Sequence, residues 1–280
     1  MTYRPTVRGR RLARELRNLR EDRGLTLQEV ADRLEWSRAT VSRVETGQTR
    51  PKVEDVAGLL DLYGVPSPER DALLTLTREA GQRGWWTAYA DVFSGSYAAL
   101  EDGASQIRNW DPQLIHGLLQ TDDYARAVIT AGRLLPRPED IERRLAARKI
   151  RQRVLGRANA PELHLVIDES VLLRPIGGRR VLSSQLASLA EAAERPNVTV
   201  QVVPFEANEH AGLDGRFTIL SFPDRADPDI AYVEGTMGDV YLESAEAIAK
   251  HRDRFERIEA VALSPEESAR YIREAAGSSQ

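Results

Sequence analysis

The side chains best suited to chemistry lie in one short stretch, between Ser37 and Lys52. In SRATVSRVETGQTRPK, arginines and hydroxyl side chains occupy the positions that the two valines leave free. Arginine can donate two parallel hydrogen bonds to guanine, and hydroxyls and cations bind phosphate oxygens. The stretch therefore favours contact with a nucleic acid over catalysis.

Two short helices are expected to position these side chains. Thr26 lies three residues before Glu29, which is the spacing of a capping box, so the first helix begins there. Ser37 is a second cap candidate, and Gly47 ends the second helix because glycine accepts the left-handed conformation after a helix. In the second helix the valines point inward, and the arginines and small side chains point outward.

The outward side chains divide into two sets by what they can contact. Arginines and small residues of the second helix suit base edges in the major groove, because arginine pairs with guanine and a small side chain packs on the thymine methyl. Hydroxyls and cations at the helix start and after its end suit phosphates, which set the register without discriminating between sequences. The predicted base contacts are Arg38, Ala39, Ser42 and Arg43. The predicted phosphate contacts are Ser37, Thr40, Thr49, Arg50 and Lys52.

The same stretch resembles the helix-turn-helix of the Cro and phage-repressor superfamily, often called the xenobiotic-response-element family. The resemblance rests on T-x-x-E-V-A, S-R-A-T-V-S-R-V-E-x-G and the Arg50-Pro51 pair that follows. It implies that Arg20 pairs with Glu45 and links the first helix of the domain to the recognition helix. Leu27 departs from the family, in which many members have a glutamine that contacts phosphate.

One recognition helix makes few base contacts. Useful specificity is therefore expected to need two copies of the chain bound to the same double-stranded DNA. The two half-sites would then lie about one helical turn, roughly 34 Å, apart. We therefore predict a homodimer.

Composition sets the outer limits on the class of protein. The chain has 280 residues, of which 41% are hydrophobic and 29% charged, as expected for a globular protein of two domains. It has no cysteine, which excludes disulfides, thiolate zinc sites and iron–sulfur clusters. No apolar run approaches the roughly 18 residues of a membrane span, so a cytoplasmic, nucleoid-associated protein is expected.

Charge is distributed unevenly along the chain. Residues 1–52 contain 13 Lys and Arg against 7 Asp and Glu, whereas the remainder contains 26 against 36. A basic head on an acidic body is typical of a protein that binds nucleic acid with one end only.

Hydrophobic periodicity and glycine or proline breaks divide the chain into three parts. Residues 1–80 are predicted to form a five-helix helix-turn-helix domain, and residues 81–160 a helical connecting and dimerisation segment. In residues 161–280 the hydrophobic periodicity changes from that of helices to that of strands. These residues are predicted to form a mixed α/β regulatory or partner-binding domain. The predicted strands are 162–168, 198–204, 217–222, 230–233 and 240–242, with helices at about 181–194, 244–262 and 264–276.

Three segments leave alternatives open. The middle part is rich in aromatic residues, which suit core and inter-domain packing better than a ligand pocket. A strongly basic helix at 138–157 is better explained as solvated or subunit-facing than as a second nucleic-acid surface. The loop 208–215 either connects strands or binds a ligand. The aromatic residues are Trp85, Trp86, Tyr89, Phe93, Tyr97 and Trp110.

The second half of the chain resembles the C-terminal domain of a large actinobacterial group of WhiJ-like regulators. The shared motifs are N-W-D-P-Q-L-I-x-G-L-L-Q-T from Asn109, D-E-S-V-L-L-R from Asp168, N-V-T-V-Q-V-V-P-F from Asn197 and Y-V-E from Tyr232. The resemblance implies a developmental or antitoxin-like transcription regulator, encoded beside a small partner protein that engages it.

No set of residues has the spacing of a catalytic or metal site. Asp168 and Glu169 form a carboxylate pair at a predicted strand end, but no base or metal-ligand motif accompanies them. Gly177-Gly178 suits a turn before a helix. We therefore predict no enzyme activity, no cofactor and no bound metal. The histidines are scattered and are interpreted as ordinary polar residues: His116, His164, His210 and His251.

The sequence therefore predicts a sequence-specific DNA-binding transcription regulator whose C-terminal domain responds to a protein partner or ligand. The alternative is an antitoxin-like protein that mainly neutralises a small partner protein and binds DNA only to regulate itself. An enzyme in the α/β domain is disfavoured.

Overall fold

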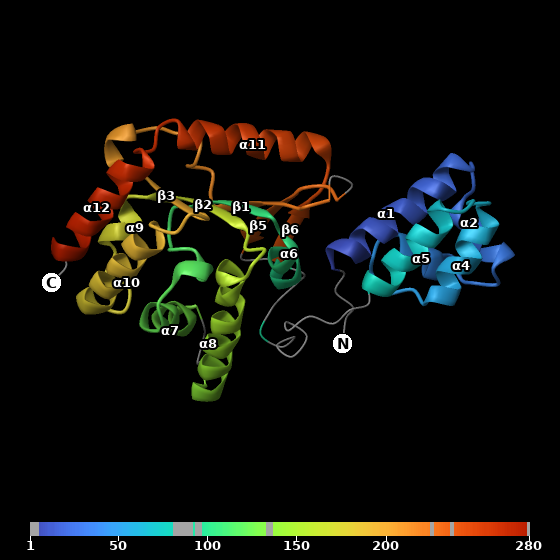
Figure 1. Ribbon diagram of the computed structural model, residues 1–280, viewed down its shortest axis with the longest axis horizontal. Helices are drawn as coiled ribbons and strands as arrows, with labels where there is room; N and C mark the ends of the chain where they lie inside the picture. Colours follow the sequence, from blue (N-terminus) through green and yellow to red (C-terminus); the bar gives the residue numbers. More distant parts are fainter. Residues whose placement is uncertain are drawn as a thin grey trace. The chain divides into compact units, whose positions relative to one another are not determined.

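A computed structural model of the chain describes residues 6–80, 92, 97–132, 137–224, 227–235 and 238–278. The chain divides into two compact units, residues 1–103 with 224–227 and residues 104–223 with 228–280 (Figure 1). Four of the aromatic residues of the middle part, Trp85, Trp86, Tyr89 and Phe93, lie outside the described residues.

The N-terminal unit is helical, and its first five helices surround one hydrophobic core. Leu16 of the first helix, Val30 of the second, Val41 of the third and Leu59 of the fourth are fully buried in it. The valine Val41, which the sequence predicts to point inward, is therefore part of the core. The helices are α1 (Val7–Asp22), α2 (Leu27–Arg33), α3 (Arg38–Glu45), α4 (Val53–Leu62), α5 (Glu69–Ala80) and α6 (Tyr97–Gly103).

Local signals explain where these helices begin and end. Thr26 and Glu29 form the predicted capping box at α2, and the Ser37 hydroxyl accepts a hydrogen bond from the Thr40 amide at α3. Gly24 and Gly47, which follow α1 and α3, have φ values of +64° and +66°. The predicted caps and stops of the helix-turn-helix are thus confirmed.

The second unit is built on one six-stranded mixed sheet with the strand order β3-β2-β1-β4-β5-β6. β1, β2 and β3 are parallel to one another, and the remaining neighbours are antiparallel. The predicted class, a helical head followed by a mixed α/β domain, is confirmed. The strands are β1 (Gln106–Asp111), β2 (Glu162–Asp168), β3 (Val198–Val203), β4 (Phe217–Ser221), β5 (Ile230–Gly235) and β6 (Gly238–Leu242).

The strand β1 corrects one sequence prediction. Residues 81–160 were expected to be helical, yet β1 lies in that segment and occupies a central position of the sheet. Its polar residue Asn109 is buried and donates to the Thr218 hydroxyl at 2.9 Å and to the Phe217 carbonyl at 3.3 Å. The strand is therefore stabilised by partners far along the chain, which local periodicity does not reveal.

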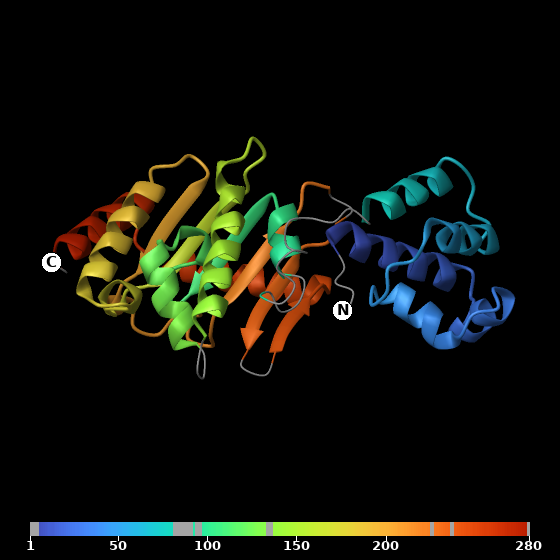
Figure 2. The ribbon, with the colours of Figure 1, turned by 90° about the horizontal axis from the view of Figure 1, so that it is seen from below.

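Helices cover both faces of the sheet. Figures 1 and 2 show α11 across one face and α7, α8 and α10 on the other. On the first face, Phe255 and Ile258 of α11 pack with Trp110 and Ile219 of the sheet. The α-helices are α7 (Asp122–Ala131), α8 (Pro138–Gln152), α9 (Ser170–Leu173), α10 (Arg179–Ala192), α11 (Ala245–Glu259) and α12 (Pro265–Ser278). The 3₁₀ turns are η2 (Gly117–Leu119), η3 (Arg153–Gly156) and η4 (Phe205–Ala207).

Trp110 holds the loop 208–215 against the end of β1. Its indole nitrogen donates to the Gly212 carbonyl at 2.9 Å, and its ring meets the His210 ring edge to face. A Cβ atom at Gly212 would lie only 2.5 Å from two carbons of the indole ring. Only glycine fits at this position, so the loop serves to pack against the core.

We expect Gly212→Ala to destabilise the second unit by about 1–3 kcal/mol, because the added methyl must displace the buried indole. Urea denaturation followed by circular dichroism measures the change. The matched control is Gly156→Ala, where no atom lies within 4 Å of the added methyl. Equal stability of the two variants would contradict this account of the loop.

Candidate nucleic-acid interface

The helix α3 turns one side into the core and the other to solvent. Val41, Val44 and Glu45 are buried, whereas Arg38 and Arg43 are exposed. Ser37 caps the helix, since its hydroxyl accepts from the Thr40 amide at 3.1 Å. The eight residues of α3 therefore form a rigid support with a cationic outer side.

The four predicted base contacts all belong to α3. Arg38 and Ala39 are exposed in the first turn, and Ser42 is half-buried one turn later. The Nε of Arg43 donates to the Ala39 carbonyl at 3.2 Å, which aligns this side chain along the helix. Within the described part of the chain, no side chain or carbonyl pairs with the guanidinium of Arg38. Its donors remain available for hydrogen bonds to a partner.

The predicted phosphate contacts flank α3 at both ends. The hydroxyls of Ser37 and Thr40 lie 2.8 Å apart and share a hydrogen bond, so one of their two protons remains to be donated outward. Thr49, Arg50 and Lys52 are exposed on the segment that follows the helix. These residues give the unit hydroxyl and cationic donors on either side of the recognition helix.

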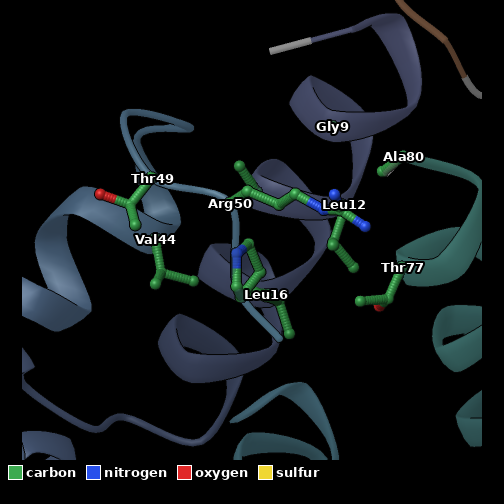
Figure 3. A pocket seen from close by; sticks show the side chains of 10 residues that line it. Gly9, Leu12, Leu16, Val44, Thr49, Arg50, Thr77 and Ala80 are labelled. Carbon is green, nitrogen blue, oxygen red and sulfur yellow. The ribbon is translucent and has the colours of Figure 1, made fainter. Parts of the chain in front are cut away.

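The segment after α3 is tied down by its own backbone and by packing. The Arg43 carbonyl accepts from the Gln48 amide at 2.8 Å and from the Thr49 amide at 3.2 Å. Figure 3 shows Thr49 and Arg50 over a cavity between α1, α3 and α5. The cavity measures about 10 Å³, enough for about one water molecule, so it is a packing defect and not a ligand pocket.

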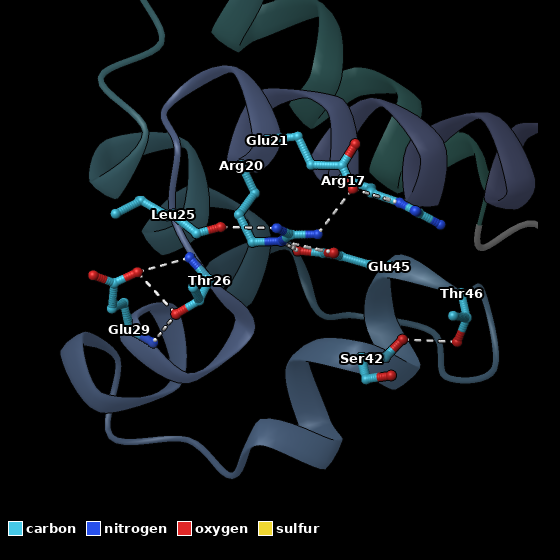
Figure 4. A network of polar contacts seen from close by, with 9 residues as sticks. All are labelled: Arg17, Arg20, Glu21, Leu25, Thr26, Glu29, Ser42, Glu45 and Thr46. Atoms are coloured by element: carbon cyan, nitrogen blue, oxygen red, sulfur yellow. Dashed lines mark hydrogen bonds and ion pairs between the residues drawn. The ribbon is translucent and has the colours of Figure 1, made fainter.

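A buried ion pair connects α1 to α3 (Figure 4). Arg20 Nε donates to both carboxylate oxygens of Glu45, at 2.8 and 3.0 Å, and the Glu45 side chain is only 3% exposed. The same guanidinium donates from Nη1 to the Leu25 carbonyl at 2.8 Å and lies 3.3 Å from the Glu21 carboxylate. The pair implied by the family resemblance is therefore present, and it also holds the chain just before α2.

Hydrogen bonding to Glu45 raises the pKa of Arg20 above its ordinary value, although burial acts against it. The guanidinium therefore remains charged at every pH at which the protein is folded. A second arginine, Arg23, donates from Nε to the Tyr63 carbonyl at 2.6 Å and connects the end of α1 to the end of α4. Of these two contacts, the Arg20–Glu45 pair supports α3 from its inner side.

The carboxylates and glycines singled out in the second half serve local structure. Asp168 accepts from the Ser170 amide at 2.9 Å, and the buried Glu169 accepts from the Phe205 amide and the Tyr271 hydroxyl. Gly177 and Gly178 form the turn before α10 with φ values of +76° and +98°. The Glu169 contacts were not foreseen, because Tyr271 lies 102 residues further along the chain.

The histidines likewise contact neighbours in the fold. The Nε2 of His164 is hydrogen-bonded to the side-chain oxygen Oε1 of Gln201 at 2.6 Å, and the Nδ1 of His251 lies 2.7 Å from the Ala247 carbonyl. His116 and His210 each accept from a backbone amide two residues on. Across the described ranges, no group of three or more His, Cys, Asp or Glu side chains could hold a metal ion.

Two family models match the chain. Residues 11–73 match a helix-turn-helix domain, and residues 94–274 match a domain of unknown function, DUF5753. The helix-turn-helix match supports a DNA-binding regulator. Neither the curated proteins nor the solved structures include a match to the chain. Among the residues that the structure describes, no helix is long and apolar enough to cross a membrane.

We expect Arg20→Met to destabilise the N-terminal unit by about 3–5 kcal/mol, because Glu45 would remain buried without its cation. The matched control is Arg17→Met on the same helix, which removes only an exposed pair with Glu21 and should cost far less, because water screens an exposed pair. Chemical denaturation of the two variants measures the difference. Similar losses would show that the buried pair does not hold α1 to α3.

The capping box at α2 predicts a pH dependence. Two hydrogen bonds lower the pKa of the Glu29 carboxyl below its ordinary value of 4.5. The bond from the backbone amide of Thr26 has the larger effect, and the bond from the Thr26 hydroxyl adds to it. The stabilisation by this carboxylate is therefore complete above the ordinary pKa and is lost as pH falls through the lowered one. We expect the stability difference between wild type and Glu29→Gln to be largest at neutral pH and to shrink below about pH 4. A difference that stays constant from neutral pH to pH 3 in denaturation experiments would contradict this role.

Proposed function

The chain belongs to the family defined by the domain of unknown function DUF5753 and carries a helix-turn-helix domain, and on that premise we propose that it is a sequence-specific transcription regulator. In this proposal α3 enters the major groove of double-stranded DNA. Its base contacts are Arg38, Ala39, Ser42 and Arg43.

The observation that carries the proposal is the outer side of α3. It presents two exposed arginines five residues apart, on a helix whose inner side is buried and ion-paired. A bidentate arginine contact discriminates between bases by about 1–3 kcal/mol, so two such contacts suit sequence recognition. Ser37 and Thr40 before the helix, and the residues Thr49, Arg50 and Lys52 after it, would bind phosphates and set the register.

The second unit would control the DNA-binding head. We propose that residues 1–80 bind DNA, residues 81–160 connect and dimerise two chains, and residues 161–280 respond to a protein partner or ligand. Two heads would then bind half-sites about one helical turn apart. This organisation agrees with the resemblance to actinobacterial WhiJ-like regulators and would locate the protein at the nucleoid.

An antitoxin-like role remains the second candidate, and the same C-terminal motifs support it. In that case the main function would be to neutralise a small partner protein, and DNA binding would serve autoregulation. The regulator role and the antitoxin role are distinguished by expressing the small proteins that are encoded beside the gene, once with this chain and once without it. Toxicity that the chain relieves would favour the antitoxin role.

We expect the double variant Arg38→Ala/Arg43→Ala to lose its preference for the chain's own promoter fragment while it retains weak, salt-dependent binding. Each lost base contact should cost about 1–3 kcal/mol of discrimination. Fluorescence anisotropy with promoter and scrambled fragments at two salt concentrations measures this.

Two controls sharpen the test. Arg50→Ala should weaken binding to both fragments equally and reduce the salt slope by about 1, as expected for one phosphate contact. Arg179→Ala/Arg180→Ala removes two exposed arginines from the second unit and should leave the preference unchanged. If the Arg38/Arg43 variant keeps the wild-type preference, α3 is not the element that recognises bases.

A further inference from the structure

We propose that a groove at the carboxyl ends of β2 and β3 binds a cationic, partly apolar segment of a partner protein. The proposal rests on the proposed function, because it names the surface of the second unit through which a partner would act. Its basis is a groove whose two walls are tied together and whose lining is acidic, with exposed apolar side chains on the neighbouring elements.

The groove lies between η4, which follows β3, and α12 at the C-terminal end of the chain. Its volume is about 270 Å³, and Glu206, Glu267, Arg270, Tyr271 and Glu274 are among the residues that line it. Pockets for small ligands measure roughly 300–1,000 Å³, so this groove suits one or two side chains of a larger partner better than an enclosed ligand.

A buried carboxylate fixes the two walls of the groove. Glu169 is 8% exposed and accepts from the Phe205 amide of η4 at 2.7 Å and from the Tyr271 hydroxyl of α12 at 2.5 Å. The bond to Glu169 raises the pKa of Tyr271 to about 12, so the hydroxyl remains a donor at neutral pH. The groove is therefore formed before any partner binds, which lowers the entropic cost of binding.

The groove attracts cations. Three glutamates line it against one arginine, and no cation pairs with Glu206 or Glu274 among the described residues. Glu267 accepts from the Ser264 amide at 3.0 Å, and this bond lowers the pKa of its carboxyl, which stays ionised. A lysine or arginine of a partner would supply the missing opposite charge.

Exposed apolar side chains on the elements next to the groove favour a protein segment over a small cation. Phe205 is 54% exposed and stands between two groove residues, Pro204 and Glu206. Leu173 is 56% exposed at the end of α9, a helix that contacts α12. Anchors of protein interfaces are often aromatic residues beside polar rims, so an amphipathic cationic segment matches this surface.

The test uses the purified full chain and two dye-labelled synthetic peptides. One is an amphipathic helix with arginines on one face and leucines on the other, and the second replaces every arginine with glutamate. Fluorescence anisotropy compares wild type with Glu206→Gln/Glu274→Gln and with Phe205→Ala. The matched control, Glu191→Gln/Glu256→Gln, removes two exposed glutamates of the same unit that do not line the groove.

We expect the arginine peptide alone to bind wild type, and the groove variants to bind it more weakly. Loss of two exposed ion pairs should lower affinity roughly two- to thirtyfold, whereas the control variant should bind like wild type. Hydrogen exchange on wild type should then show protection at residues 204–207 and 263–274. Failure of the arginine peptide to bind, or equal binding by groove and control variants, would overturn the proposal.

The peptide experiment and the promoter experiment can fail independently of each other. If the Arg38/Arg43 variant keeps the promoter preference while the peptide protects the groove, the DNA-recognition proposal fails and the docking surface stands. If the promoter preference depends on those arginines and the peptide does not bind, only the docking surface fails.

Discussion

The N-terminal unit depends on one buried charge. The carboxylate of Glu45 is almost fully removed from water, and a charge in that position is costly unless a cation pairs with it. Arg20 supplies the cation and also donates to the carbonyl of Leu25. One side chain of α1 therefore holds both the end of α3 and the chain before α2. The direction of the outer side of α3 is therefore set by contacts on its inner side.

In the second unit, hydrogen bonds from buried side chains fix the loops at the carboxyl ends of the parallel strands. Trp110 binds the loop that follows η4, and Glu169 binds η4 and α12, so loops at the carboxyl ends of the parallel strands are tied to the core. Loops fixed on a rigid sheet are common positions for binding surfaces. Each unit thus presents a surface of opposite charge on a rigid support: a cationic helix in one and an acidic groove in the other.

The two units differ in how far the sequence predicts them. The caps at Thr26 and Ser37 involve residues three positions apart, so the helix-turn-helix follows from local pattern. β1 has only Ile107 and Trp110 as apolar residues, and it is defined by pairing with β2 and β4, far along the chain. The groove is likewise invisible in the sequence, because loops and helices distant in sequence form it.

The most direct test of the central claim is dimethyl sulfate footprinting of the chain on its own promoter. The reagent methylates guanine N7 in the major groove and adenine N3 in the minor groove, so it identifies the groove that α3 occupies. The account predicts protection of guanine N7 in two clusters about 10 base pairs apart, one for each head of a dimer. Protection of adenine N3 alone, or no protection at a protein concentration that saturates the DNA, would contradict recognition by α3 in the major groove.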